Sequence, residues 1–480
     1  MIFPTTDFAL FFLIVFFVSW ALIRRYTGPW KVFMLAASWF FYGYWDWRFI
    51  ALLAGSSVFN HVMALGMHRG KNPHVRRLLL TLAVAFNVSS IGFFKYSRFL
   101  AEQVVAVCGW LKFDLDAWFP VLDYLGQVIL PVGISFFTFQ AMSYVIDVYR
   151  RVMPPADSFL DFALYLAFFP QLVAGPIVRA RDLVPQISKP CPPPTIDTAR
   201  AACLILGGLF KKIVVANFLS QQIVDPVFAR PDLYGALDTL IGVYGYAIQI
   251  YCDFSAYSDI AIGLGILLGF QINLNFNAPY LAGSIQEFWR RWHISLSTFL
   301  RDYLFIPLGG SRGSEAKTYR NLLITFLLGG LWHGAGWTFI AWGALHGVYL
   351  SVERFFRRAM ERQGWSGEGL FALWLKRLAV WHLVCLSWLF FRGETFEHAL
   401  TMLRAMKLWG TASTLVTGPV LLAIVVGYGM QWFDGDRAQR LWNAFGRLPA
   451  AVQGLVTAAI LTVILALGPK GVAPFIYFQF

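Results

Sequence analysis

The chain has 480 residues, of which 58% are hydrophobic and 14% are charged. Soluble domains carry charge on about a quarter of their residues, so this composition excludes a string of soluble domains and predicts a polytopic membrane protein. The net charge of +13, from 39 basic and 26 acidic residues, does not gather on a soluble module, which argues against a nucleic-acid partner. The five cysteines show no metal-ligand spacing, so no metal site is expected.

Apolar runs of about 18 to 25 residues, the length that crosses a bilayer, recur along nearly the whole chain. They predict an all-α integral membrane protein with about eleven to thirteen transmembrane or re-entrant helices. Residues 321–353 form one apolar stretch broken by glycines, which allows two short helices or one long bent helix. The expected spans are 7–24, 32–48, 50–66, 78–94, 126–147, 200–218, 235–251, 256–270, 321–339, 340–353, 371–391, 412–430 and 450–468.

Short basic loops separate pairs of these spans in the N-terminal part of the chain. The loops at 24–31, 68–77 and 149–151 alternate as the positive-inside rule predicts for an N-terminus outside the cytoplasm. The first span has no basic segment before it, whereas Arg24 and Arg25 follow it. We therefore expect this span to stay in the protein and not to be a removable signal peptide.

A proline-rich linker is expected at 183–200, because proline cannot continue a helix. Thr195 and Asp197 near its end are good N-cap residues for the apolar run that begins near Ala201. The linker does not separate independent domains, and we treat the chain as one membrane domain. Its expected parts are an N-terminal helical part at 1–182, the linker, a catalytic core at 201–355 and C-terminal helices at 356–480.

Residues 275–321, which we call the polar island, form the longest segment without an expected span. Arginine and lysine outnumber acidic residues there, and tryptophan and phenylalanine are interleaved with them. This pattern is typical of short helices in the membrane interface, and the basic excess predicts the cytoplasmic side. The arginines are either surface anchors or contacts to a phosphate-rich ligand, since guanidinium groups match phosphate geometry.

One histidine, His333, lies inside the apolar run "LLITFLLGGLWHGAGWTFIAWG". An ionisable residue at membrane depth is costly and usually marks a functional site. On a continuous helix its neighbours at i−4, i−3, i+3 and i+4 are Gly329, Gly330, Gly336 and Trp337, so three glycines leave space beside the imidazole. We expect His333 to accept a proton in a reaction. The alternative is a glycine-mediated helix contact in which the histidine only bonds a neighbouring helix.

His293, in "EFWRRWHIS", is the second candidate. It is either an interfacial histidine or a group that joins His333 across a tunnel. The other six histidines are interpreted as structural, and among them His346 has the strongest claim to another role.

The stretch "YCDFSAYSDIAIGLG" at 251–265 is the third candidate. On a helix, Asp253 faces Tyr257 and Ser255 faces Asp259, so polar stripes run through an apolar segment. Hydrogen bonding between helices is favoured over a substrate path. No GxSxG, Walker or HExxH motif occurs, which argues against a self-contained hydrolase triad and against nucleotide or zinc chemistry.

Three long segments, "YCDFSAYSDIAIGLGILLGF", "FWRRWHISLSTFLRDYLFIPLGGSRGS" and "TYRNLLITFLLGGLWHGAGWTFIAWGALHG", resemble the central signatures of membrane-bound O-acyltransferases. The segments "LPVGISFFTFQAMSYVIDVYR", "FPQLVAGPIVR" and the closing "PFIYFQF" fit the bacterial branch that includes the membrane subunit of alginate O-acetylation. The resemblance runs nearly end to end.

This resemblance implies a multi-helix fold around a membrane tunnel, with acetyl-CoA as acyl-donor substrate and no bound cofactor. The near-invariant histidine of the family corresponds to His333, and its more variable second position corresponds to His293. By the same resemblance and the residues around them, donor binding is assigned to Arg290, Arg291, Trp292 and Arg312, and the tunnel lining to Trp332, Trp337, Asp253 and Tyr257.

The expected function is O-acetylation of an exported polysaccharide, alginate or a similar exopolysaccharide, by an enzyme of the bacterial inner membrane. No expected external segment is large enough for a soluble catalytic domain, so a periplasmic SGNH-type acetyltransferase partner is expected to complete delivery. Cellulose and peptidoglycan are alternative acceptors. Two alternatives belong to another class: a transporter with His333 as proton relay, and a non-catalytic scaffold. A transporter would be indicated by an inverted repeat, and none is visible in the sequence. The acceptor, the partner, direct transfer or covalent relay, the oligomeric state and the exact helix count stay open.

Overall fold

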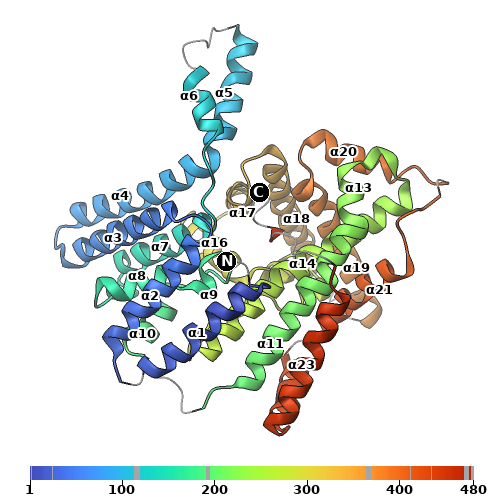
Figure 1. Cartoon of the computed structure of the whole chain (residues 1–480). Helices are drawn as coiled ribbons and strands as arrows, with labels where there is room; N and C mark the ends of the chain where they lie inside the picture. The colour runs from blue at the N-terminus through green and yellow to red at the C-terminus, as the bar shows by residue number, and fades with distance from the viewer. Residues whose placement is uncertain are drawn as a thin grey trace. The chain divides into compact units, whose positions relative to one another are not determined.

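The computed structural model describes residues 1, 3–23, 25–112, 119–190, 195–363, 369–410, 412–433, 435–469 and 475–476. Every regular element in these ranges is helical, which confirms the predicted all-α membrane fold (Figure 1). Among the described helical segments, seven are long and apolar enough to span a membrane. They are Thr6–Ile23, Arg48–Arg69, Pro73–Leu111, Thr198–Ala229, Ala236–Leu267, Leu370–Arg392 and Ala450–Leu467, and Gly418–Trp432 is a shorter apolar segment.

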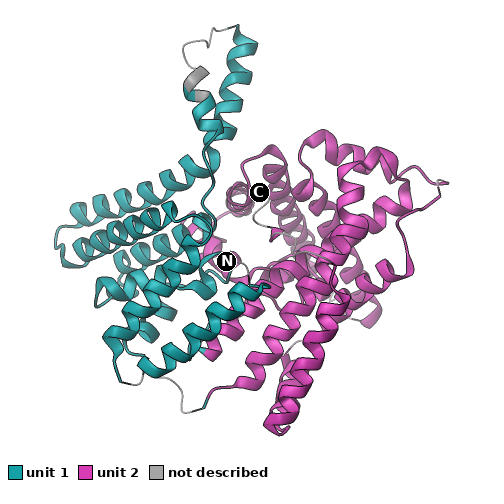
Figure 2. Cartoon of the chain, viewed as in Figure 1, with its two compact units in different colours: residues 1–195, 268–272 teal, residues 196–267, 273–480 magenta. Residues whose placement is uncertain are grey.

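The chain forms two compact units (Figure 2). Unit 1 comprises Met1–Thr195 and Leu268–Ile272, and unit 2 comprises Ile196–Leu267 and Asn273–Phe480. The boundary falls inside the predicted linker. Of the predicted features, residue 24 of the first basic loop, residues 191–194 of the linker and most of the closing segment 474–480 lie outside the described residues.

The linker is shorter than expected at its N-terminal end. Residues up to Ser188 continue as helix α10 (Ala180–Ser188), with Pro185 inside it. Asp197 caps the next helix as predicted, because its side chain accepts a hydrogen bond from the Arg200 backbone N–H at 2.9 Å.

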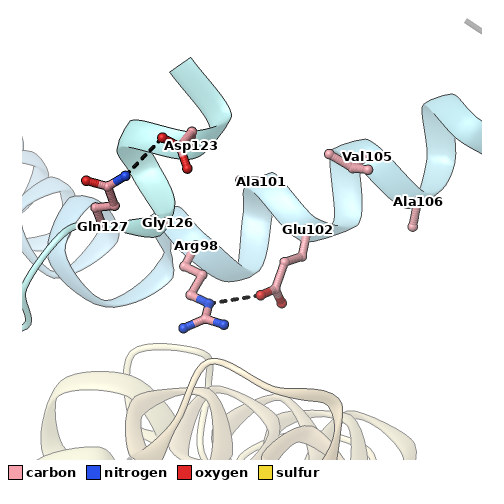
Figure 3. Close-up of a pocket in the computed structure, with 8 residues that line it drawn as sticks. All are labelled: Arg98, Ala101, Glu102, Val105, Ala106, Asp123, Gly126 and Gln127. Atoms are coloured by element: carbon pink, nitrogen blue, oxygen red, sulfur yellow. Dashed lines mark hydrogen bonds and ion pairs between the residues drawn. The ribbon is translucent and has the colours of Figure 1, made fainter. Parts of the chain in front are cut away.

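Unit 1 is a helical bundle with a mostly apolar core. Its helices are α1 (Thr6–Ile23), α2 (Thr27–Gly43), α3 (Arg48–Arg69), α4 (Pro73–Ile91), η1 (Gly92–Tyr96), α5 (Ser97–Leu111), α6 (Phe119–Gly126), α7 (Ile134–Tyr149), α8 (Phe159–Ala167), α9 (Phe169–Leu172) and α10. A pocket of about 520 Å³ lies between α5 and α6 (Figure 3). Its polar groups pair with each other: Arg98 Nε lies 3.0 Å from Glu102 Oε1, and Gln127 Nε2 donates to Asp123 Oδ2 at 2.9 Å. This pocket is lined by no histidine or cysteine and carries no candidate chemistry.

Unit 2 contains the catalytic-core segment and the C-terminal helices. Its elements are α11 (Thr198–Leu209), η3 (Phe210–Ala216), α12 (Asn217–Leu219), η4 (Ser220–Val224), α13 (Asp225–Ala229), η5 (Pro231–Leu233), α14 (Ala236–Leu267), η6 (Pro279–Leu281), α15 (Ile285–Arg291), α16 (Ile294–Leu300), η7 (Arg301–Phe305), α17 (Glu315–His333), α18 (Trp337–Arg362), α19 (Leu370–Arg392), α20 (Phe396–Ala405), α21 (Gly418–Gly429), η8 (Met430–Trp432), α22 (Gly435–Gly446) and α23 (Ala450–Leu467).

Helix α14 is the most buried span of unit 2, with 83% of its most apolar window inside the protein. The expectation of two separate spans at 235–251 and 256–270 is wrong, because these residues form one helix of 32 residues. Its polar residues do not interrupt it, since neighbouring elements supply their partners.

Two of those partners are consecutive lysines of the π-helical segment η3. Lys211 Nζ lies 2.5 Å from Asp259 Oδ2 and donates to Ser255 Oγ at 2.8 Å, and Lys212 Nζ lies 2.7 Å from Asp253 Oδ1. The predicted preference for interhelical bonding in this stretch therefore holds for its two aspartates, although their lysine partners were not foreseen from the sequence.

Replacing Lys212 with methionine is expected to destabilise the protein by about 3–5 kcal/mol, because Asp253 would remain as an unpaired buried charge. The thermal unfolding midpoint of the detergent-solubilised protein measures this change. The double variant Lys212→Met/Asp253→Leu removes both charges and should recover most of the lost stability. An unchanged midpoint in the single variant would contradict a stabilising role for the ion pair.

Candidate active site

The polar island folds into short helices, as predicted. Ser284 caps α15 by accepting from the Glu287 backbone N–H at 3.0 Å, while Glu287 Oε2 accepts from the Gly283 N–H at 2.8 Å. The cap satisfies one of the backbone donors that a helix leaves unpaired at its N-terminus, and Glu287 in turn holds the residue before the cap. The helix ends after Arg291, and α16 begins at Ile294 on the other side of His293.

Helices α17 and α18 arise from the glycine-broken stretch and cross closely. A Cβ atom on Gly330 would lie 2.2 Å from the Phe339 carbonyl oxygen, and one on Gly343 would lie 2.2 Å from the Phe326 carbonyl oxygen. The two backbones can approach this far only because both positions lack side chains.

The glycines therefore do not clear space beside His333, which corrects that prediction. Helix α17 ends at His333 and α18 begins at Trp337, so Gly336 and Trp337 do not share a helix face with the histidine. The face at Gly330 is filled by α18, and a Cβ on Gly329 would lie 3.1 Å from Leu300. Gly330 does make the close helix contact of the alternative interpretation, against Phe339 and Gly343 of α18.

His333 lies in a cage of aromatic rings. Its imidazole centroid is 4.9 Å from those of Trp332 and Trp342 and 5.2 Å from that of Phe391, and the residue is 3% exposed. Three different helices supply these rings: α17, α18 and α19. The cage holds an ionisable ring in apolar surroundings.

His293 is fully buried, so the alternative of an exposed interfacial histidine is wrong for it. Its ring centroid is 4.6 Å from that of Phe254 on α14, and its Nδ1 lies 3.2 Å from Asn275 Oδ1. Burial lowers the pKa of His293 to about 3, so the ring is neutral at physiological pH.

Trp332 joins the two histidines. Its ring centroid lies 6.0 Å from that of His293 and 4.9 Å from that of His333, so one indole contacts both. Residues 40 positions apart in the sequence thus meet at one place in unit 2. Two buried imidazoles therefore contact one indole, and a neutral imidazole can accept a proton from a reacting hydroxyl or thiol.

Unit 2 also contains a pocket of about 430 Å³. It is formed by α15, α16, η7, α17 and α18. Trp289 lines it and also packs on Trp342, with centroids 5.7 Å apart, so a chain of ring contacts leads from the pocket to His333. Its basic lining residues are Arg290, Arg301, Arg354 and Arg357.

Glu353, an acidic residue among those lining the pocket, is engaged by the backbone. Its Oε2 accepts from the Ile285 N–H at 2.5 Å and from the Gln286 N–H at 3.4 Å, at the start of α15. The carboxylate is thus held at a helix N-terminus, where the dipole favours negative charge. Two of the lining arginines already pair with carboxylates, Arg301 with Asp302 at 2.7 Å and Arg354 with Glu315 at 3.0 Å. Arg290 and Arg357 are the other two, and guanidinium groups suit an anionic ligand.

Of the residues predicted to bind the acyl donor, only some lie at the pocket. Arg290 lines the pocket, whereas Arg291 pairs with Glu287 at 2.7 Å. Trp292 is buried against Phe288, with stacked rings 5.6 Å apart. Arg312 lies at an exposed turn before α17, next to a pocket-lining serine. Arg301, Arg354 and Arg357 were not assigned to this pocket from the sequence. Arg354 and Arg357 lie on α18, which the sequence shows only as an apolar span followed by charged residues.

The residues predicted to line the tunnel do not all lie in one place. Trp332 contacts both histidines as described, whereas Trp337 is 57% exposed at the start of α18. Asp253 is occupied by Lys212 and by the Ile476 N–H, whose nitrogen lies 2.8 Å from Asp253 Oδ2. Tyr257 packs on Phe475, with ring centroids 5.2 Å apart.

His346 has the bonding of a structural histidine. Its Nδ1 accepts from the Trp289 indole N–H at 3.2 Å, so its Nε2 is the donor to Ser387 Oγ at 3.0 Å. Ser387 in turn donates to the Val384 carbonyl oxygen at 2.7 Å. This chain of bonds fixes the ring between α15, α18 and α19, and supports the structural interpretation.

Residues 157–393, which include His293, His333 and the pocket, match the family model described as MBOAT, membrane-bound O-acyltransferase family. The whole chain aligns with the whole of the probable alginate O-acetylase AlgI of Azotobacter vinelandii at 37% identity. The chain belongs to the membrane-bound O-acyltransferase family.

Other members of this family are similar over most of their length. The probable alginate O-acetylase AlgI of Pseudomonas aeruginosa is 40% identical over 86% of this chain and 76% of its own. The peptidoglycan O-acetyltransferase of Helicobacter pylori is 38% identical over 85% of this chain and 80% of its own. This membrane-bound O-acyltransferase is therefore a multi-pass membrane enzyme, which decides against the transporter and scaffold alternatives.

Proposed function

We propose that this enzyme transfers an acetyl group from acetyl-CoA for the O-acetylation of an exported polysaccharide. The observation that carries the proposal is that His293 and His333 both contact Trp332, and that ring contacts through Trp289 and Trp342 connect His333 to an arginine-lined pocket. The relatives named for alginate and peptidoglycan O-acetylation support a polysaccharide acceptor. The bacterial inner membrane is the proposed location.

The arginine-lined pocket is the proposed site for the phosphates of coenzyme A. Arg290 and Arg357 are exposed in it, as a site filled from the cytoplasm requires, and guanidinium groups bind phosphate through paired, charge-assisted hydrogen bonds. The narrow pantetheine arm would extend along Trp289 and Trp342 toward His333. The thioester would then lie within reach of both histidines.

In the proposed reaction, the imidazole of His333 takes the proton of an incoming hydroxyl. The hydroxyl oxygen bonds to the thioester carbonyl carbon, the carbon–sulfur bond breaks, and the imidazolium returns the proton to the leaving thiolate. The products are an acetyl ester and free coenzyme A. General base catalysis of this kind contributes about 10²- to 10⁴-fold, and alignment of hydroxyl and thioester in the site supplies a further part of the rate.

The hydroxyl is proposed to belong to a serine of a periplasmic SGNH-type acetyltransferase, which passes the acetyl group to the polysaccharide. Within the described ranges, the segments between helices are too short to form a soluble catalytic domain, which supports a separate protein that holds the polymer chain. Purified protein in vesicles, with acetyl-CoA outside and polymer inside, tests this division. Stable acetylation of the polymer without any partner would overturn the relay. If the thioester is not cleaved even with partner and polymer present, the proposed reaction is wrong.

Replacing Arg290 or Arg357 with alanine is expected to raise the KM for acetyl-CoA about tenfold, because each loses roughly 1.4 kcal/mol of charge-assisted bonding to phosphate. The kcat should change by less than about twofold, since the phosphates bind equally in ground and transition states. Initial rates of thiol release at varied acetyl-CoA concentration measure both parameters. Arg230→Ala, at an exposed arginine paired with Asp232 at 3.0 Å, is the control. An unchanged KM in both variants would show that the donor binds elsewhere.

A further inference from the structure

Asn275 is a buried amide at the junction of three elements of the active site. It lies in the loop between α14 and η6 and is 0% exposed. Its side chain contacts Ser258 on α14, His293 between α15 and α16, and Ser295 on α16. Sequence reasoning did not single out this residue.

The orientation of the Asn275 amide follows from one donor. The Ser295 backbone N–H, 3.1 Å away, can only donate, so the atom facing it is the carbonyl Oδ1. The Ser295 hydroxyl donates to the same oxygen at 2.8 Å. The amide nitrogen Nδ2 is then directed to Ser258 Oγ, to which it donates at 3.1 Å.

This orientation determines the tautomer of His293. Asn275 Oδ1 can only accept, and His293 Nδ1 lies 3.2 Å from it, so Nδ1 must carry the proton. With Nδ1 unprotonated, two lone pairs would face each other at that distance. Ser295 Oγ lies 3.4 Å from Nδ1, but its hydroxyl proton is engaged in the shorter bond to Asn275. In a neutral imidazole the other nitrogen, Nε2, is then the acceptor.

The backbone around His293 is held by the same loop. His293 has φ 41° and ψ 56°, a left-handed conformation that costs a residue with a side chain about 1–2 kcal/mol. The Ile294 N–H donates to the Asn275 carbonyl oxygen at 2.9 Å, and the Asn277 N–H donates to the Arg291 carbonyl oxygen at 2.9 Å. A strained backbone retained at a buried ionisable residue is typical of a functional position.

We infer that Asn275 is a positioning residue for acyl transfer, which holds His293 with its proton on Nδ1 so that Nε2 acts as an acceptor. This inference rests on the proposed function. It assigns His293 to accept a hydrogen bond from the reacting hydroxyl or thiol, while His333 takes the proton. In this form His293 does not donate to the oxyanion of the tetrahedral intermediate.

The test compares two replacements of Asn275, only one of which keeps an acceptor oxygen. Asn275→Leu removes the acceptor, whereas Asn275→Asp keeps an oxygen to accept from Nδ1–H and Ser295. The leucine variant is expected to lose about 10- to 100-fold in kcat with unchanged KM, the range found when a partner that orients a functional histidine is removed. The aspartate variant should retain kcat within about threefold, because the tautomer is preserved. Thiol release per folded molecule in vesicles with the partner measures both.

A purely structural role predicts the opposite order, because a buried carboxylate is more costly than a buried apolar side chain. An aspartate variant as slow as the leucine variant, or slower, would therefore overturn the inference. In a His293→Ala background, Asn275→Leu should cost less than about twofold further, and an additive loss would also overturn it. If His293→Ala leaves no measurable rate, the order of the two single variants decides.

Asn87→Ala is the matched control for loss of a buried amide. Asn87 is also 0% exposed and donates to Asn60 Oδ1 at 2.7 Å, in unit 1. Its replacement should leave kcat per folded molecule unchanged. An inactive wild-type protein would count against the proposed function, whereas an active wild type with an unaffected leucine variant would count against the role of Asn275 alone.

Discussion

Replacing His333 with alanine is expected to reduce acetyl transfer by about 10²- to 10⁴-fold, the contribution of a general base. The helix crossing that positions this residue depends on Gly330 and Gly343, which the substitution does not touch. The imidazole contacts Trp332, Trp342 and Phe391, so the variant leaves a small cavity between rings while the helices stay in place. The amount of protein in the membrane should therefore be near the wild-type level.

The measurement is polysaccharide acetylation in cells, with membrane levels of the protein determined in parallel. His346→Ala is the matched comparison, because His346 is equally buried but bonded at both nitrogens to structural partners. It should lower the amount of folded protein, since Trp289 and Ser387 lose their bonding partner, and should retain acetylation per folded molecule. Full acetylation in the His333→Ala variant at normal level would make His333 a packing residue.

Replacing Gly330 with alanine is expected to lower both stability and activity. Its Cβ would lie 2.2 Å from the Phe339 carbonyl oxygen and 3.1 Å from the Phe339 carbonyl carbon, and backbone atoms cannot move aside as a flexible side chain can. Helices α17 and α18 would have to separate, and overpacking of this kind costs about 1–3 kcal/mol. His333 is three residues from Gly330 and Trp342 is adjacent to Gly343, so the same separation would open the contact between the two rings.

The thermal unfolding midpoint and the rate of thiol release measure the two effects. Gly207→Ala is the control, because Gly207 lies inside helix α11 and a Cβ there would meet nothing within 4 Å. Alanine is favoured over glycine in a helix by up to about 1 kcal/mol, so this control should be neutral or slightly more stable. A Gly330→Ala protein as stable and active as the control would show that the close crossing is not required.

Much of the fold could be predicted from composition and apolar run length. The run at 7–24 becomes α1, and that at 450–468 becomes α23, because each is long enough to span a bilayer and is flanked by polar or helix-ending residues. The division at 235–251 and 256–270 failed for a different reason. The polar residues between these two runs look like an interruption in the sequence, yet buried lysines from η3 pair with them, and α14 continues without a break.

The site was predicted in part. His333 could be ranked first from its depth in an apolar run alone, since burial of an ionisable group is costly wherever its neighbours lie. Whether the space beside His333 is open could not be decided from the sequence. A glycine leaves room on one helix face, and a second helix can pack closely into that room. Arg354 and Arg357 could not be assigned to the arginine-lined pocket, because only the packing of α18 on α17 brings them to it.

By itself the sequence determined the membrane environment, the helical class, the family resemblance and the two histidines, because run length, charge and residue type are properties of single segments. The tertiary structure decided which groups share a site: the meeting of His293 and His333 at Trp332, the arginines of the pocket, and the bond from Asn275 that sets the tautomer of His293. These are distances between segments far apart in the chain. They depend on how closely helices pack, which no local pattern specifies.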